Sequence, residues 1–243
     1  MDNEEKIGGR AYSNGVRLKN KNRSVKAYYD NNGDIKIETK QVKKNTYMNY
    51  IKYLPIIRGI AVLFFAVLSF LKEVFKDPKK YWFIFLIVIA EILYMMLPGD
   101  SSTAIQGVFF IIYISIPIIL LIIFKSSVSE VLKFHGAEHK AVNYYENNYK
   151  GNIVSYSRIH RRCGSNIVFF YIIISILVSF FDLGFPLLLK ELLILGIAYE
   201  AIKYLPEKLL GIPSVFQKIF AREPDERQLK AAEKALEVLT NKN

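Results

Sequence analysis

The chain has 243 residues, and its 33 lysines and arginines against 22 acidic residues give it a formal net charge of +11. Hydrophobic residues make up 52% of the sequence although 23% of it is charged, so the apolar residues are concentrated in blocks. Such a composition excludes disorder for most of the chain. The one cysteine, Cys163, excludes a disulfide scaffold. The acidic start, Met1-Asp2-Asn3-Glu4-Glu5, has no apolar run behind it, so no signal peptide is expected.

Residues 1–53 are polar and basic, and they are predicted to form a small β-rich region. Two β-prone runs, Val25–Tyr29 and Ile35–Thr39, flank the segment Asp30-Asn31-Asn32-Gly33-Asp34. That segment favours a tight turn, because Asn, Asp and Gly tolerate positive φ angles. We therefore expect a β-hairpin, joined by a third strand near Arg10–Leu18.

Residues 54–210 contain four apolar blocks, each close in length to the roughly 20 residues that a helix needs to cross a bilayer. This pattern predicts a mostly α-helical, polytopic membrane protein with about four transmembrane helices. The predicted spans lie near residues 81–97, 105–124, 167–181 and 185–205. A shorter apolar block, Gly59–Leu71, is expected to form a re-entrant or interfacial helix.

The charges between these blocks predict an orientation in the cell membrane. Lysines and arginines gather before the first span, in the 125–166 loop and after the fourth span, whereas residues 98–104 contain none. The positive-inside rule then places both termini and this loop in the cytoplasm. We interpret the excess of basic residues as a result of the membrane topology and of attraction to the lipid bilayer. Nucleic-acid binding is not expected, because no nucleic-acid motif accompanies the charge.

Residues 211–243 are predicted to be a cytoplasmic C-terminal region with one amphipathic helix. Pro224 and the acidic residues that follow it suit a helix N-terminus. The apolar stripe of this helix consists of Leu229, Ala232, Leu236 and Leu239. We expect it to dock on the rest of the protein.

All three histidines and the one cysteine lie inside the 125–166 loop, within a stretch of 29 residues. On a helix, His135 and His139 lie one turn apart with Glu138 between them, the H-x-x-E-H spacing that is typical of inverted zinc peptidases. Two imidazoles at this spacing can bind one metal ion, and Glu138 can act as the base toward a water molecule. His160 and Cys163 would complete a tetrahedral zinc site with four ligands.

Two functions follow from this cluster, and the number of ligands separates them. Three protein ligands and an open position favour a zinc-dependent hydrolase, with Glu138 catalytic and a small molecule or a peptide as substrate. Four ligands favour a zinc-stabilised membrane scaffold, or a membrane-protein partner in biogenesis or quality control. A third possibility is a thiol role for Cys163.

Two further charged residues are candidates to support the ligands. Glu200, near the cytoplasmic end of the fourth predicted span, is a metal ligand, a hydrogen-bond partner of a ligand histidine or an interfacial residue. Arg162 adjoins Cys163 and favours its thiolate, which suits zinc ligation and nucleophilic attack alike. Glu91 in the first predicted span and Glu200 in the fourth are acidic residues within the membrane, and such residues are also found in transporters. The sequence has no internal repeats, however, which many transporters contain.

Several short motifs occur in an order that resembles a bacterial family. They are Gly8-Gly9-Arg10-Ala11, Pro55–Gly59, Phe134–Lys140, Arg158–Ser165, Ala198–Glu200 and Arg222–Glu226. In these motifs the chain resembles, over nearly its whole length, the YqhQ-like family (domain of unknown function 1385). This resemblance implies a multi-span membrane protein that is a metal-dependent enzyme. The chain departs from the family at Asn14, which cannot act as an acid or base where the family has an acidic residue.

Overall fold

The structure is a computed structural model, and it describes residues 6–42, 50–51, 53–79, 81–96, 103–181, 184–204, 206, 209 and 211–241. The chain divides into two compact units. One comprises Met1–Val62 with Ser129–Asn243, and the other is Leu63–Val128. The acidic start Met1–Glu5 and the side chain of Glu91 lie outside what the structure describes.

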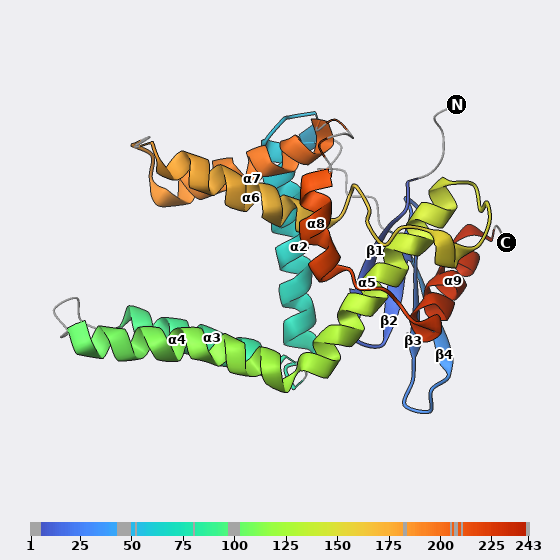
Figure 1. The fold of residues 1–243 in the computed structure, drawn as a ribbon, viewed down its shortest axis with the longest axis horizontal. Coiled ribbons are helices and arrows are strands. Elements are labelled where there is room, and N and C mark those ends of the chain that lie inside the picture. Colours follow the sequence, from blue (N-terminus) through green and yellow to red (C-terminus); the bar gives the residue numbers. More distant parts are fainter. Residues whose placement is uncertain are drawn as a thin grey trace. The chain divides into compact units, whose positions relative to one another are not determined.

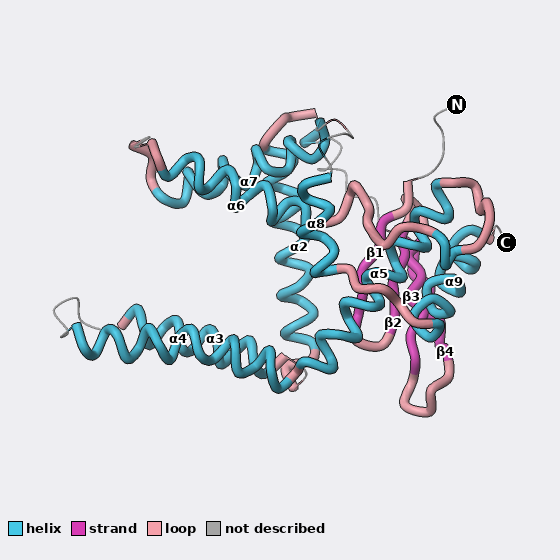
Figure 2. Tube along the Cα trace, viewed as in Figure 1, coloured by secondary structure: helices cyan, strands magenta, loops and turns pink. Residues whose placement is uncertain are grey.

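A four-stranded antiparallel sheet forms the N-terminal part of the first unit (Figures 1 and 2). Its strands pair in chain order and are β1 (Gly8–Tyr12), β2 (Gly15–Lys19), β3 (Arg23–Tyr29) and β4 (Ile35–Gln41). The predicted hairpin is present as β3 and β4, and Gly33 in its turn has a φ angle of 85°. The single strand expected near Arg10–Leu18 is instead two strands, because the chain reverses at Ser13 and Asn14.

One face of the sheet forms the core of the first unit. The alternation of side chains along β2 and β3 buries four apolar residues on it, namely Val16, Leu18, Val25 and Ala27. The predicted amphipathic helix is present as α9 (Glu226–Thr240), which contacts both strands and begins with a capping box at Asp225. Helix α5 (Lys125–Glu146) adds four residues to the same core, Phe134, Ala137, Ala141 and Val142.

The other described elements are helical. They are α2 (Ile57–Lys76), α3 (Trp82–Met95), α4 (Thr103–Ile123), the short 3-10 helix η1 (Ile153–Ser155), α6 (Gly164–Ser179), α7 (Leu187–Tyr204) and α8 (Gly211–Phe220). The block Gly59–Leu71, expected as a short interfacial helix, is the middle of the 20-residue α2. The fold is thus mostly helical, with one antiparallel sheet at its N-terminal end.

The prediction of about four transmembrane helices is wrong. In the described part of the chain, no helix by itself has both the length and the apolar composition to cross a membrane. One pair of segments, Ile114–Ile123 and Lys125–Glu146, meets these criteria only when taken together across a bend. The spans expected near residues 81–97 and 167–181 are helices of 14 and 16 residues. Both are shorter than the roughly 17–25 residues that a span needs.

Glu200 pairs with an arginine of α2. The Arg58 Nε atom donates a hydrogen bond to Glu200 Oε1 at 2.7 Å, and the Ile56 N–H donates to the same oxygen at 3.2 Å. These bonds hold the pKa of the Glu200 carboxyl below its usual value. Helices α2 and α7 approach so closely that a Cβ on Gly59 would lie 2.6 Å from the Cβ of Tyr199. Glu200 therefore joins these two helices, and its carboxylate is neutralised there.

Gly136 allows α5 to lie against the segment that joins α8 to α9. A Cβ at this position would lie 1.9 Å from the carbonyl oxygen of Arg222. The N–H of Arg222 also donates to the carbonyl of Leu132 at 3.0 Å, which fixes the segment in place. We expect Gly136→Ala to lower the free energy of unfolding by at least about 1–3 kcal/mol, because overpacking forces two backbones apart. Urea denaturation measures this change.

Gly107 in α4 provides the control for this substitution. It also lies within a helix, but nothing lies within 4 Å of a Cβ built on it. Gly107→Ala is expected to leave stability unchanged or to raise it by about 0.5–1 kcal/mol, because alanine restricts the unfolded chain. Equal unfolding midpoints for the two variants would contradict the steric role of Gly136.

Candidate metal centre

Helix α5 presents three of the predicted site residues on one face. His135, Glu138 and His139 are three and four residues apart, so their side chains project in the same direction. The adjacent side of the same turns is buried in the core through Phe134 and Ala137. Packing of the apolar face against the sheet therefore fixes the direction in which the site residues point.

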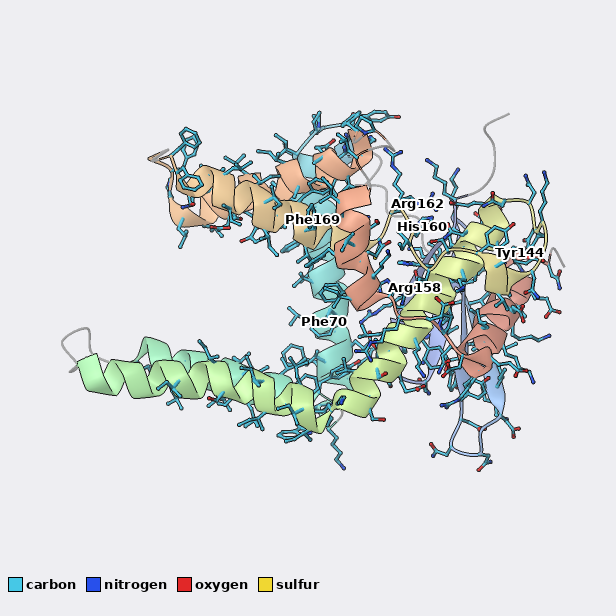
Figure 3. All side chains as sticks on the ribbon, in the orientation of Figure 1. Phe70, Tyr144, Arg158, His160, Arg162 and Phe169 are labelled. Carbon is cyan, nitrogen blue, oxygen red and sulfur yellow. The ribbon has the colours of Figure 1, made fainter. Side chains whose placement is uncertain are left out.

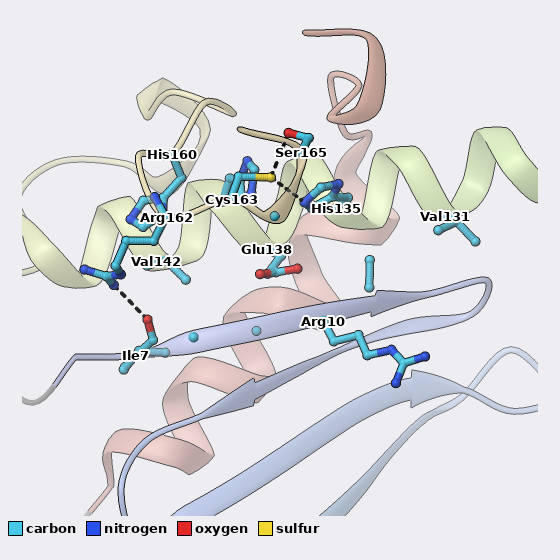
Figure 4. Close-up of a pocket in the computed structure, with 15 residues that line it drawn as sticks. Ile7, Arg10, Val131, His135, Glu138, Val142, His160, Arg162, Cys163 and Ser165 are labelled. Carbon is cyan, nitrogen blue, oxygen red and sulfur yellow. Dashed lines mark hydrogen bonds between the residues drawn. The ribbon is translucent and has the colours of Figure 1, made fainter. Parts of the chain in front are cut away.

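The segment between η1 and α6 brings His160 (Figure 3) and Cys163 (Figure 4) back to α5. Gln217 of α8 holds this segment through its fully buried amide. The His160 N–H donates to Gln217 Oε1 at 2.8 Å, and Gln217 Nε2 donates to the His160 carbonyl at 3.0 Å. Because both ends of the amide are satisfied, the backbone that leads to Cys163 has a defined position.

Three of the four predicted ligands converge on one point. The ligand atoms of His135, His139 and Cys163 lie within 4.8 Å of one another, and Cys163 Sγ is 3.4 Å from His135 Nε2. The Nδ1 atoms of the two histidines lie 2.9 Å from the Phe220 carbonyl and 2.6 Å from the Arg158 carbonyl, respectively. A carbonyl oxygen accepts a hydrogen bond, so we assign a proton to Nδ1 of each ring, which leaves Nε2 as the lone-pair nitrogen of the neutral imidazole.

This donor set fits a zinc ion. Two imidazole nitrogens and one thiolate are ligands that zinc prefers, and bond lengths of about 2.0–2.3 Å place tetrahedral ligands about 3.3–3.6 Å apart. The distance of 3.4 Å between Cys163 Sγ and His135 Nε2 matches this spacing, whereas the widest separation in the group, up to 4.8 Å, exceeds it by about 1 Å. Carbonyl partners on the far nitrogens of both histidines are also the usual surroundings of metal-binding imidazoles.

His160, the fourth predicted ligand, lies beside this group and makes other contacts. Its ring centroid is 5.8 Å from that of His139. Its Nε2 is 3.1 Å from Glu146 Oε2, and its Nδ1 accepts a hydrogen bond from the Arg162 N–H at 3.2 Å. Burial lowers the pKa of His160, against the effect of Glu146. Both ring nitrogens are thus occupied by protein groups in this arrangement.

The two residues predicted to support the ligands lie apart from them. The Arg162 guanidinium donates to the Ile7 carbonyl at 2.9 Å and pairs with Glu146, so it connects β1 to the segment before α6. Glu200 lies with Arg58. The direct partners of the ligand histidines are instead the Phe220 and Arg158 carbonyls described above.

Electrostatics favour charged forms of two ligands. Burial opposes ionisation of the Cys163 thiol, but hydrogen bonds and charges from His135 and His139 lower its pKa to about 4. Burial also disfavours the His135 cation, yet its contact with Cys163 raises the pKa of His135 to about 9. The sulfur is therefore in the thiolate form that binds metal ions.

Glu138 lies in the wall of the same site, between α5 and β1 (Figure 4). The residue is only 8% exposed, and no described residue donates a hydrogen bond to its carboxyl group. Burial raises the pKa of this carboxyl to about 7, although His139 and His135 act in the opposite direction. A Cβ on Gly9 would lie 2.6 Å from Glu138 Cγ, so the absence of a side chain at Gly9 makes room for Glu138.

A cavity of about 420 Å³ opens next to these groups. Its walls come from three segments, which are Ile7–Ala11 at the start of the sheet, the face of α5 that carries Glu138, and residues 160–165. A substrate in this cavity would contact the converging ligands and Glu138 at the same time.

Most of the groups that orient the ligands could not be predicted from local sequence patterns. The Phe220 and Arg158 carbonyls belong to the backbone, which carries no residue-specific signal. Gln217 reaches His160 from 57 residues away. Only Glu146 could have been expected near the site from the sequence, because it lies seven residues after His139 and hence on nearly the same side of α5.

Comparison with known proteins gives a family. A family model described as "Protein of unknown function (DUF1385)" matches residues 18–242. The chain is also 25% identical, over 284 aligned positions, to "Uncharacterized protein YqhQ" of Bacillus subtilis (strain 168), an alignment that covers 93% of this chain and 89% of that protein. No solved structure gives a significant match. Since the family match spans most of its length, the chain belongs to the DUF1385 family.

Proposed function

We propose that this protein is a metal-dependent hydrolase with zinc as its ion. In this proposal His135, His139 and Cys163 hold the ion, and Glu138 is the general base. The observation that carries it is the combination of three converging ligands with a buried carboxyl group that no described residue hydrogen-bonds, both in the wall of one cavity. Three protein ligands are the number found in catalytic zinc sites.

The residues of the chain have distinct roles in such a reaction. When bound, a zinc ion supplies Lewis acidity, which lowers the pKa of a water molecule and polarises a substrate carbonyl. Glu138 takes the proton from the attacking water and returns it to the leaving group. The Phe220 and Arg158 carbonyls keep His135 and His139 in the tautomer that offers Nε2.

Metal content and hydrolysis test this proposal together. We expect the purified protein to bind one zinc ion per chain and to hydrolyse p-nitrophenyl acetate, an ester that requires no specific recognition. Treatment with 1,10-phenanthroline should remove both properties, and added zinc should restore both. A protein that binds no zinc, or whose ester hydrolysis survives removal of the metal, would overturn the proposal.

A zinc-stabilised scaffold is the second candidate function. It is favoured by the position of the ligands, which join α5 to the segment before α6, while the Phe220 carbonyl ties His135 to α8. An ion bound there would cross-link elements that are distant in the sequence and would stabilise the fold. In this case chelation lowers the melting temperature, and no substitution of Glu138 affects function.

A further inference from the structure

Strand β1 is an edge of the sheet, and its free side lies at the cavity. The strand order β1-β2-β3-β4 leaves one side of β1 without a neighbouring strand. Residues Ile7–Ala11 line the cavity, and Gly8 and Gly9 are exposed. An edge strand offers a row of backbone donors and acceptors with which another extended chain can pair.

The register of the sheet shows which backbone groups point toward this free side. The Tyr29 N–H donates to the Asn14 carbonyl at 2.8 Å, so the neighbouring pair Gly15 and Tyr28 is a non-hydrogen-bonded pair. The N–H and C=O of Gly15 therefore face β1, where Gly15 is opposite Tyr12. Hydrogen bonding alternates along an antiparallel pair, so Gly9 and Ala11 direct their N–H and C=O groups away from β2.

These outward groups have no hydrogen-bond partner among the described residues. Glu138 lies over the face of β1 at Gly9, since a Cβ on Gly9 would be 2.7 Å from Glu138 Oε1. A chain that paired with β1 would thus run past the carboxyl group and the three ligands. The two consecutive glycines keep side chains out of its path.

We propose that the substrate is an extended polypeptide, which binds by adding a strand to the free side of β1 through Gly9 and Ala11. This inference rests on the hydrolase function proposed above and gives that function its substrate class. Main-chain hydrogen bonds of this kind supply affinity without requiring a particular sequence. The amide bond that is cleaved is the one that lies next to Glu138 in the bound peptide.

The reaction is amide hydrolysis. The oxygen of water forms a bond to the scissile carbonyl carbon, and the C–N bond breaks. Glu138 removes a proton from the water and transfers it to the amine nitrogen that leaves. The products are one carboxylate and one amine, so no oxidant, reductant or further reactant is needed.

A proline at position 11 tests the role of β1. Ala11→Pro removes one outward N–H but no hydrogen bond of the β1–β2 pair, and edge strands accept proline at such positions. The substrates are a library of internally quenched peptides and p-nitrophenyl acetate. We expect the ratio of kcat/KM for the best peptide to kcat/KM for the ester to fall about tenfold, the effect of one lost hydrogen bond.

Thr39→Pro is the matched control. Thr39 lies on β4 at the opposite edge, and because the Val42 N–H donates to the Asn22 carbonyl, the same alternation turns the Thr39 N–H outward. This variant should keep the ratio of the wild-type protein.

If Ala11→Pro does not fold, strand addition can be tested by modifying the peptide substrate. Methylation of single backbone nitrogens in the best peptide should reduce cleavage about tenfold at alternate positions only, because a strand pairs through every second residue. Cleavage that is indifferent to both changes overturns strand addition. Ester hydrolysis that depends on Glu138, without cleavage of any peptide, overturns the substrate class alone. Absence of both activities overturns the hydrolase proposal and this inference with it.

Discussion

Glu138→Gln is expected to reduce hydrolysis by about 10²–10⁴-fold while the protein keeps its zinc and its fold. Glutamine has the size of glutamate but cannot accept the proton of the attacking water. The side chain makes no hydrogen bond with a described residue, so its substitution breaks no structural contact of that kind. Ester hydrolysis, zinc content and the unfolding midpoint, measured on one preparation, separate the loss of a base from the loss of the site.

Glu130→Gln on the same helix is the control for this substitution. Glu130 accepts a hydrogen bond from Gln228 at 3.0 Å and does not line the cavity. Its replacement should leave hydrolysis at the wild-type rate. If Glu138→Gln retains full activity with zinc bound, Glu138 is not the base, and the zinc-stabilised scaffold becomes the better account.

His139→Ala and His160→Ala should differ strongly in their effects on metal binding. His139 offers its Nε2 to the ligand group, whereas both ring nitrogens of His160 are paired with protein groups. We expect His139→Ala to weaken zinc binding by more than about 100-fold, because even a change in a partner of a ligand costs about 10–100-fold. His160→Ala should weaken it by about tenfold or less. Competition with a zinc-binding dye measures both affinities.

Stability provides the second readout for this pair. The His160 side chain is buried and makes two contacts that alanine cannot make, with Glu146 and with the Arg162 N–H. Its replacement should therefore lower the melting temperature of the metal-free protein, whereas the effect of His139→Ala should appear mainly when zinc is present. Loss of zinc in His160→Ala at an unchanged fold would restore the four-ligand, closed site.

Local features of the sequence predicted much of the candidate site. The H-x-x-E-H spacing placed His135, Glu138 and His139 on one helical face, because an α-helix has a fixed period. The same reasoning predicted α9 from its apolar stripe and the β3–β4 hairpin from its turn residues. Each of these inferences needs only contacts or periods within about 20 residues.

The features that sequence reasoning missed depend on contacts between distant segments or on where helices end. Hydropathy identified the apolar blocks, but it did not show that the backbone of α3 forms only 14 helical residues. Nor did any local pattern show that His160 would meet Glu146, since the separation of the two depends on the turn after α5. Similarly, the Gly8-Gly9 pair is an ordinary turn signal until the sheet places it beside Glu138.

The Phe220 carbonyl that orients His135 has a consequence for biosynthesis. The two residues are 85 positions apart, so at about 5–20 residues per second a ribosome makes Phe220 roughly 4–17 s after His135. Leu239, whose carbonyl accepts a hydrogen bond from Arg23 of β3, is made later still. The three ligands therefore acquire their final arrangement only after Phe220 has been made, because its carbonyl orients His135.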